Sequence, residues 1–299
     1  MNQKEKKYLD YIRANSPETP LQNVTFDFMS GAHSDVVVAD GKTAFRFARN
    51  DWSACFVTNA ARAVRLAKNY VELPLPDLVL LEPGVVKYGF IPGRPLLRQE
   101  LLRAKSLEQD SFAKQIGTFL SELHSVPLKE AKAARLEGRF AEQNRRYWEA
   151  RFHELEKKLS SYCDGYAQDS LRELFRAPLE KENFFDCVPC LIHADPGPRH
   201  FICDRESHEI AAAVGFGSSG IGDPALDTAA LLANFGEAFV SRVAEYDEAI
   251  PQQLSRARFY AAQRPLDRAL ELADRIATRD FSGCRFDPTE PGVLPAGRF

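Results

Sequence analysis

The 299-residue sequence lacks several features that would place it outside the ordinary globular proteins. No apolar run approaches the roughly 18 residues of a membrane-spanning helix, so we expect no membrane partner. The opening segment, MNQKEKKYLDYIRANSPE, is polar and has no apolar stretch of signal-peptide length. The formal net charge is −3, which predicts that no polyanion, and hence no nucleic acid, is the main ligand.

Cysteine is also scarce, with six residues scattered along a chain that is large enough to fold without disulfide staples. Such usage predicts free thiols in a reducing, cytoplasmic environment. Cys187 and Cys190 form the motif CVPC shortly before His193, but no second Cys/His pair has a finger-like spacing. We therefore expect two buried, inert thiols that bind no metal.

A hydrophobic content of 44% and a charged content of 27% are ordinary for a globular protein. The length of the chain and the order of its patterns predict two lobes. A short amphipathic helix is predicted over residues 1–14. The β-rich runs SDVVVAD and KTAFRFAR and one helical run, VTNAARAVRLAKNYVE, follow. IPGRPL is the first credible linker. We expect an N-lobe over residues 1–92 and a helical C-lobe over residues 93–299, with a loose tail from about residue 284.

Helical patterns predominate beyond the linker. In QDSFAKQIGTFLSELHSVP one helical face holds Phe112, Ile116, Phe119, Leu120 and Leu123. Alternating charges over residues 137–176 predict a solvated helical stretch, and further helices are expected to about residue 278.

The segment LIHADPGPRHFICD offers the first candidate for chemistry. His193 and Asp195 are expected to share a face at the end of a strand, and His200 follows across a proline-braced loop. An aspartate at such a site can accept a proton from a hydroxyl, and a nearby side chain can hold a metal. Equally, Asp195 could cap a turn and the histidines could be hydrogen-bonded loop residues.

Two further segments allow both a structural and a functional interpretation. In GIGDPALDTAALL, Asp227 fits the first turn of a helix, whereas Asp223 is less well explained by such a role. In MSGAHSDVVVADGKTAFRF, Gly31 could belong to a loop over phosphates, although a plain β-hairpin is favoured by the residues alone.

Taken together, these segments resemble the aminoglycoside phosphotransferase family, in the branch of the 2″-aminoglycoside and macrolide kinases. The pattern His193-Ala194-Asp195 followed by His200 resembles its catalytic loop. SDVVVADGKTAFRFAR, LPLPD, FIPGRPL and FLSELHSVP resemble its other landmarks, in the right order, over roughly residues 20 to 235. The resemblance implies an α+β, two-lobed, protein-kinase-like fold, with a small β-rich N-lobe, a larger helical C-lobe, and ATP or GTP between them.

The same resemblance assigns roles to individual positions. Asp195 corresponds to the catalytic base and His200 to a metal ligand. Five positions correspond to nucleotide-binding ones: Gly31, Ser34, Arg46, Tyr88 and Phe90. Arg46 stands in place of the usual phosphate-binding Lys, and Tyr88 to Phe90 correspond to the hinge between the lobes. Structural positions near the site are His193, Asp223 and Asp227.

The sequence departs from the family pattern where a metal should bind. Gly215 stands in place of the magnesium-binding Asp, and Ser218 replaces the next acid. The helix Glu that pairs with the phosphate-binding cation corresponds to Ala60 or a residue within two positions of it. Because magnesium prefers an octahedral set of oxygen ligands, His200 alone makes a poor site, and Mg²⁺ is doubtful. Gly215→Asp is accordingly expected to increase magnesium-dependent nucleotide affinity.

Two functions follow as hypotheses. The first is nucleotide-dependent phosphoryl transfer to a hydroxyl of a small molecule or peptide, with non-standard metal handling. The second is a catalytically silent pseudokinase that binds or scaffolds a protein partner.

Overall fold

A five-stranded antiparallel sheet forms the core of the first 89 residues in the computed structural model, which describes residues 1–29, 34–137, 143–204, 207 and 209–278. The strand order is β1-β2-β3-β5-β4. The strands are β1 (Val24–Asp27), β2 (Ser34–Ala39), β3 (Thr43–Ala48), β4 (Val79–Glu82) and β5 (Val85–Gly89).

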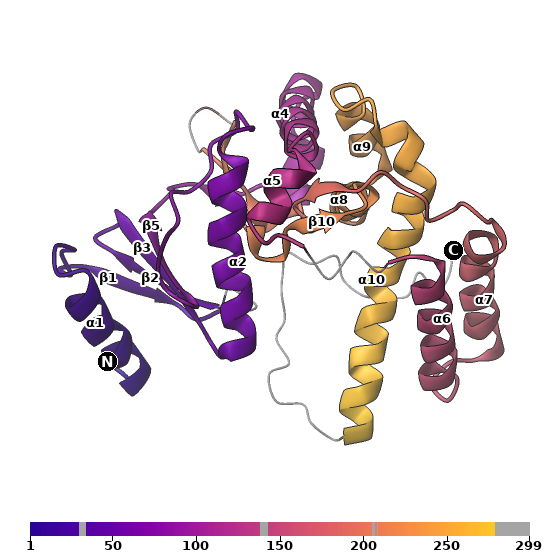
Figure 1. Cartoon of the computed structure of the whole chain (residues 1–299), viewed down its shortest axis with the longest axis horizontal. Coiled ribbons are helices and arrows are strands. Elements are labelled where there is room, and N and C mark those ends of the chain that lie inside the picture. The colour runs from indigo at the N-terminus through magenta and orange to yellow at the C-terminus, as the bar shows by residue number, and fades with distance from the viewer. Residues whose placement is uncertain (30–33, 138–142, 205–206, 208, 279–299) are drawn as a thin grey trace.

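Two helices flank this sheet, α1 (Gln3–Asn15) and α2 (Asp51–Ala67). Phe45 and Phe47 of β3 are buried in one cluster with Ile12 of α1. Because side chains alternate along a strand, Arg46 points to the opposite face of the sheet. That face packs against α2, which stands between the sheet and the rest of the molecule (Figure 1).

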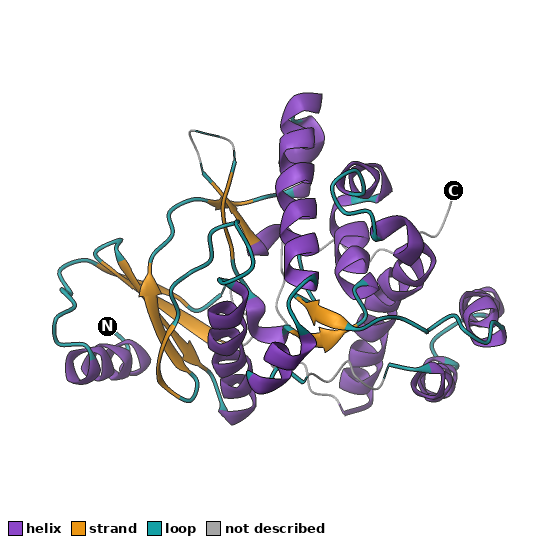
Figure 2. Cartoon of the chain, turned by 45° about the horizontal axis from the view of Figure 1, so that its top comes forward, coloured by secondary structure: helices purple, strands orange, loops and turns teal. Residues whose placement is uncertain are grey.

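The C-terminal part is mainly helical (Figure 2). Its helices are α3 (Arg98–Arg103), α4 (Ser106–His124), α5 (Leu128–Ala133), α6 (Arg145–Leu159), α7 (Gly165–Glu180), α8 (Ala225–Phe235), α9 (Glu237–Val243) and α10 (Ile250–Thr278). The long helix α10 lies between the central elements and the pair formed by α6 and α7 (Figure 1). Its Phe259 and Tyr260 pack on Trp148 of α6, which fixes α6 beside α10.

In the described part of the chain, five short strands, paired in two small sheets, position the loops of the C-terminal part that carry the candidate site residues. β7 pairs with β10, while β8 pairs with both β6 and β9. These strands are β6 (Arg94–Pro95), β7 (Cys190–Ile192), β8 (Phe201–Cys203), β9 (Ile210–Ala213) and β10 (Gly220–Gly222), and two 3₁₀ turns accompany them, η1 (Pro198–His200) and η2 (Phe216–Ser218). The segment from 193 to 200 and the segment from 214 to 219 are thereby brought side by side.

The predicted division into a β-rich N-terminal region and a helical C-terminal region is confirmed. The predicted helices at residues 1–14 and 109–127 correspond to α1 and α4. Gly31 and the tail beyond residue 284 lie outside the described residues. Among the helices that the structure describes, none is both long and apolar enough to cross a bilayer.

Candidate active site

The loop after β7 turns sharply at Ala194, whose φ of 74° is a left-handed value that side chains other than glycine rarely adopt. The expected strand alternation therefore does not extend to His193 and Asp195, because β7 ends at Ile192. His193 is fully buried and its Nε2–H donates to the carbonyl of Val214 at 2.9 Å. Its Nδ1 accepts a hydrogen bond from the backbone N–H of Asp195, so His193 supports the loop from beneath.

Asp227 of α8 anchors this loop. Its buried carboxylate accepts hydrogen bonds from the backbone N–H groups of His193 and Ala194 at 2.9 and 2.6 Å. Nε2 of His124 lies 3.0 Å from the same carboxylate. Hydrogen bonds to a charged carboxylate are strong, so Asp227 holds the loop at residues 193–194 in place. Its role is therefore structural, and it is not a reacting group.

The carboxylate of Asp195 faces α10. Nη2 of Arg264 donates to its Oδ1 at 2.9 Å, while Nη1 of the same guanidinium is buried without a hydrogen-bond partner in the described structure. The Asp195 side chain remains 28% exposed, so a ligand can reach it. No sequence pattern indicated Arg264, which lies 69 residues further along the chain.

One face of α10 is directed at this loop and its neighbour. Arg256, Tyr260 and Arg264 follow one another at helical spacing of four residues. Arg256 and Tyr260 donate hydrogen bonds to the carboxylate of Asp223 at 2.7 and 3.1 Å. Burial and the Asp223 charge raise the pKa of Tyr260, so the phenol keeps its proton. Asp223 thus joins α10 to the segment before α8.

The ring of His200 lies directly against Gly215, the residue at the predicted position of the metal-binding Asp. Its Nδ1–H donates to the carbonyl of Asp195 at 2.5 Å. Gly215 adopts a φ of 91°, and a Cβ there would lie 2.5 Å from Nε2 of His200. Burial lowers the pKa of His200 to about 4, and the ring is therefore neutral at pH 7. The expectation that Gly215→Asp increases magnesium-dependent nucleotide affinity stays a prediction, and the His200 ring would have to move to admit the new side chain.

The donor set does not fit magnesium. His200 offers one nitrogen, Gly215 offers no side-chain ligand, and the described residues contain no group of three or more His, Cys, Asp or Glu arranged to hold a metal. Ser219 supplies no replacement, since its hydroxyl donates to the carbonyl of His193.

On the opposite side of the site, Arg46 of β3 has a buried Nε without a hydrogen-bond partner in the described part of the chain. A guanidinium with free donors is suited to phosphate oxygens. Phe90 follows β5, and its side chain is 40% exposed while its backbone N–H donates to the carbonyl of Lys42. Tyr88 is half-buried and Ser34 is buried at the start of β2. Their predicted roles at a nucleotide remain predictions, as does that of Gly31.

Helix α2 contacts the segment after Gly215 through Asn59, a residue that sequence reasoning missed. Its amide donates to the carbonyls of Gly217 and Ser219 at 3.0 and 2.8 Å. Ala60 instead packs in the hydrophobic core. A neutral amide therefore connects α2 to this segment, one residue from the predicted position of the helix Glu. Among the described residues, no acid of α2 pairs with Arg46.

The prediction that both thiols of the CVPC motif are buried is correct for Cys190 and wrong for Cys187. Cys190 is buried in β7, but Cys187 is exposed, because it precedes the strand and lies outside the core. Desolvation of its sulfur and the nearby Asp223 raise the pKa of the Cys187 thiol to about 11, which keeps the thiol protonated and unreactive. The absence of a bound metal stays a prediction.

Comparisons with known proteins agree with this fold. The model of the phosphotransferase enzyme family (APH) matches residues 28–274. No curated protein sequence matches the chain.

Several solved structures are similar in fold. Wild-type aminoglycoside 2'-phosphotransferase-IIIa in complex with GDP is 21% identical, with 93% of this chain and 94% of that chain covered and a TM-score of 0.79. The GDP and kanamycin complex of APH(2")-IIia is 20% identical, with 92% and 93% covered and a TM-score of 0.77. Macrolide 2'-phosphotransferase MphH from Brachybacterium faecium is 18% identical, with 92% and 94% covered and a TM-score of 0.71. The predicted kinase-like fold is thereby confirmed.

Proposed function

The chain belongs to the phosphotransferase enzyme family, and from this premise we propose that it transfers a phosphoryl group from ATP or GTP to a hydroxyl of a small molecule or peptide. The observation that carries the proposal is Asp195, an accessible carboxylate in a loop that Asp227 holds in place. The GDP complex of one protein of similar fold and the GDP and kanamycin complex of another support a nucleotide and a small-molecule acceptor.

Each residue of the site has a defined task in this proposal. The acceptor oxygen bonds to the γ-phosphorus as the bond from phosphorus to the bridging oxygen breaks, and Asp195 takes the hydroxyl proton. Arg46 binds phosphate oxygens through its guanidinium fork. Non-standard metal handling is part of the proposal, because Gly215 and His200 do not present the oxygen ligands that magnesium prefers.

The surroundings of Asp195 favour a particular kind of acceptor. A polycationic molecule that approached this carboxylate would meet the guanidinium of Arg264 at 2.9 Å from it. Like charges at such distances repel, most strongly where water is partly excluded. A neutral or anionic hydroxyl compound is therefore favoured over a polycationic aminoglycoside.

Calorimetry of nucleotide binding, followed by transfer of labelled γ-phosphate, tests the proposal. We expect ATP or GTP to bind with and without magnesium, and Arg46→Ala to weaken this binding. Label transfer to a hydroxyl compound should depend on Asp195. If neither ATP nor GTP bound the folded protein, with or without a metal ion, the proposal would be refuted.

A pseudokinase is the second candidate, and the position of His200 favours it. The ring occupies the place of a catalytic metal ligand, so the chain could retain a nucleotide-binding cleft and a protein partner without turnover. The two candidates differ in their dependence on Asp195. Full function of both Asp195→Asn and Arg46→Ala in cells would favour the pseudokinase, whereas loss of function in folded Asp195→Asn would favour the enzyme.

A further inference from the structure

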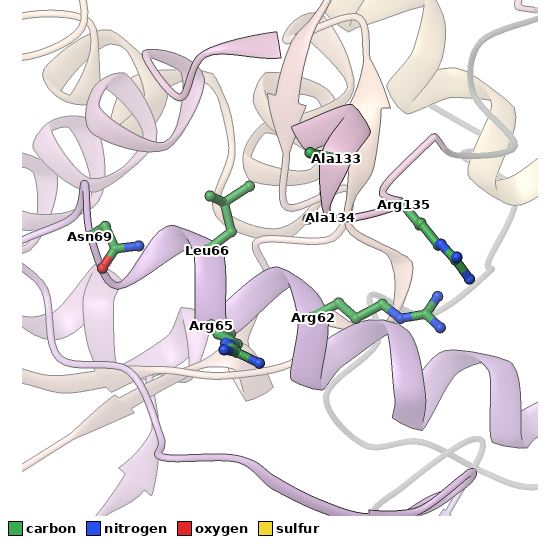
Figure 3. Close-up of a pocket in the computed structure, with 7 residues that line it drawn as sticks. All are labelled: Arg62, Arg65, Leu66, Asn69, Ala133, Ala134 and Arg135. Atoms are coloured by element: carbon green, nitrogen blue, oxygen red, sulfur yellow. The ribbon is translucent and has the colours of Figure 1, made fainter. Parts of the chain in front are cut away.

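A separate cavity of about 600 Å³ lies between the second half of α2 and the end of α5 (Figure 3). Its polar lining consists of Arg62 and Arg65 from α2, Asn69 from the turn after α2, and Arg135 from the residues after α5. Leu66 and two alanines supply the apolar part. Among the described residues, the lining contains no acidic side chain, and it shares none of the residues assigned to the nucleotide or to catalysis.

The three arginines of this cavity have no carboxylate partner in the part of the chain that the structure describes. Within the described residues, none of their guanidinium groups makes a hydrogen bond or an ion pair. Exposed arginines elsewhere do pair with carboxylates, as Arg172 does with Glu156 and Arg176 with Glu173. Their cations repel one another: Arg62 and Arg65 are three residues apart on one helix, and Figure 3 shows the side chains of Arg62 and Arg135 directed toward each other. An anionic ligand would relieve this repulsion.

The position of Arg135 is set by backbone hydrogen bonds. Its φ of 57° is left-handed, at the end of α5 where a glycine is the usual residue. The N–H of Arg135 donates to the carbonyl of Lys132, and the N–H of Leu136 donates to that of Ala131. Leu136 is buried and its carbonyl accepts from the N–H of Ile221. An arginine is thus held in an unfavourable backbone conformation with its side chain at the cavity.

Both walls of the cavity are connected to the segment that follows Gly215. Asn59, one helical turn before Arg62, donates to the carbonyls of Gly217 and Ser219. Arg135 precedes Leu136, which is hydrogen-bonded to Ile221 of β10. A ligand that bridges α2 and the end of α5 would therefore restrain residues 217–221 from two sides.

We propose that this cavity binds a small molecule carrying two or more phosphate groups, at a site distinct from the nucleotide cleft. Guanidinium groups bind phosphate through paired, charge-assisted hydrogen bonds, and three of them can neutralise several negative charges. The volume lies within the range of small-molecule sites, and the apolar part can cover an uncharged portion of the ligand. Occupancy restrains the segment beside Gly215 and so regulates the cleft.

The binding site itself does not depend on phosphoryl transfer, so it can be tested on the intact chain without an assay of activity. Tripolyphosphate and orthophosphate serve as probes in calorimetry without metal. The test variants are the pair Arg62→Ala with Arg65→Ala, and Arg135→Gly, which removes the side chain while placing glycine where the backbone favours it.

Two controls separate this site from others. Arg172→Ala with Arg176→Ala removes the same charge from α7, and Arg46→Ala disables the phosphate position of the cleft. We expect tripolyphosphate to bind more tightly than orthophosphate, and to bind about tenfold or more weakly in both test variants. Both controls should stay within about twofold of the unsubstituted chain.

The proposal would be overturned if tripolyphosphate did not bind at millimolar concentration, or if it bound the folded Arg135→Gly variant as tightly as the unsubstituted chain. It would also be overturned if either control lost as much affinity as the test variants. Thermal unfolding of each variant establishes that it is folded. Hydrogen exchange at residues 216–221 provides a second measurement, and slower exchange with tripolyphosphate is the result expected if the ligand restrains this segment.

Discussion

The imidazole of His200 covers Gly215, so that any side chain at residue 215 would overlap the ring. The position of the ring and the lack of a side chain at residue 215 are therefore structurally linked. The neutral ring donates from Nδ1 to the carbonyl of Asp195, and thereby connects Gly215 to the loop that carries the proposed base.

Gly215→Asp is expected to destabilise the fold by about 2–4 kcal/mol, because the new side chain meets His200 and the residue must keep a φ of 91°. Combining it with His200→Asn provides space, and aspartate is among the residues that tolerate left-handed backbone. We expect the double variant to recover most of the stability and to gain about tenfold in nucleotide affinity on adding magnesium. Urea unfolding and calorimetry measure the two effects.

His200→Asn alone is the matched control for that experiment, since it opens the space without adding a carboxylate. Its nucleotide affinity should respond to magnesium no more than that of the unsubstituted chain. If this control gained as much as the double variant, the added carboxylate would not be the ligand.

The stability of the protein should fall as the pH is lowered from about 6.5 to about 4, in part because of His200. Its pKa in the folded state is about 4, whereas an unfolded histidine titrates near 6.5. Between these values the unfolded chain binds a proton that the folded chain does not, so the free energy of unfolding decreases by up to about 3 kcal/mol. His200→Asn should remove this part of the pH dependence in denaturant unfolding followed from pH 7 to 4. An identical slope in both proteins would contradict it.

Ala194→Gly is expected to stabilise the protein by about 0.5–1 kcal/mol, because glycine adopts the φ of 74° without the steric cost that alanine bears. The backbone N–H at this position keeps its hydrogen bond to Asp227. Ala150→Gly on the exposed surface of α6 is the control, and should destabilise by about 1 kcal/mol through helix propensity. A loss of stability in Ala194→Gly, measured by urea unfolding, would show that the left-handed backbone carries no steric cost here.

Asp195→Asn should lower phosphoryl transfer by about 100-fold or more, because the amide cannot accept the hydroxyl proton. The side chain is partly exposed and keeps an oxygen for Arg264, so stability should change by less than about 1 kcal/mol. Single-turnover transfer of labelled phosphate, combined with thermal unfolding, measures both quantities. Transfer at an undiminished rate would remove Asp195 from the role of base.

Local patterns in the sequence were enough to predict the strands of the N-terminal sheet, the helices α1 and α4, and the loop that carries Asp195. They also identified the family. Such features are encoded by neighbouring residues, through alternation of side chains along strands, helical periodicity and the spacing of a motif. They could be predicted without knowing how the elements pack.

Tertiary structure alone decided which distant side chains meet. Arg264 reaches Asp195 because Trp148 and Tyr260 pack α10 between α6 and the central strands. Asn59, rather than Ala60, contacts the segment after Gly215, which depends on the rotation of α2 about its axis. Arg135 joins Arg62 at one cavity only because α5 ends beside α2. Contacts between elements depend on packing angles and on rotation about helix axes, and these are settled by the whole core rather than by any short stretch of residues.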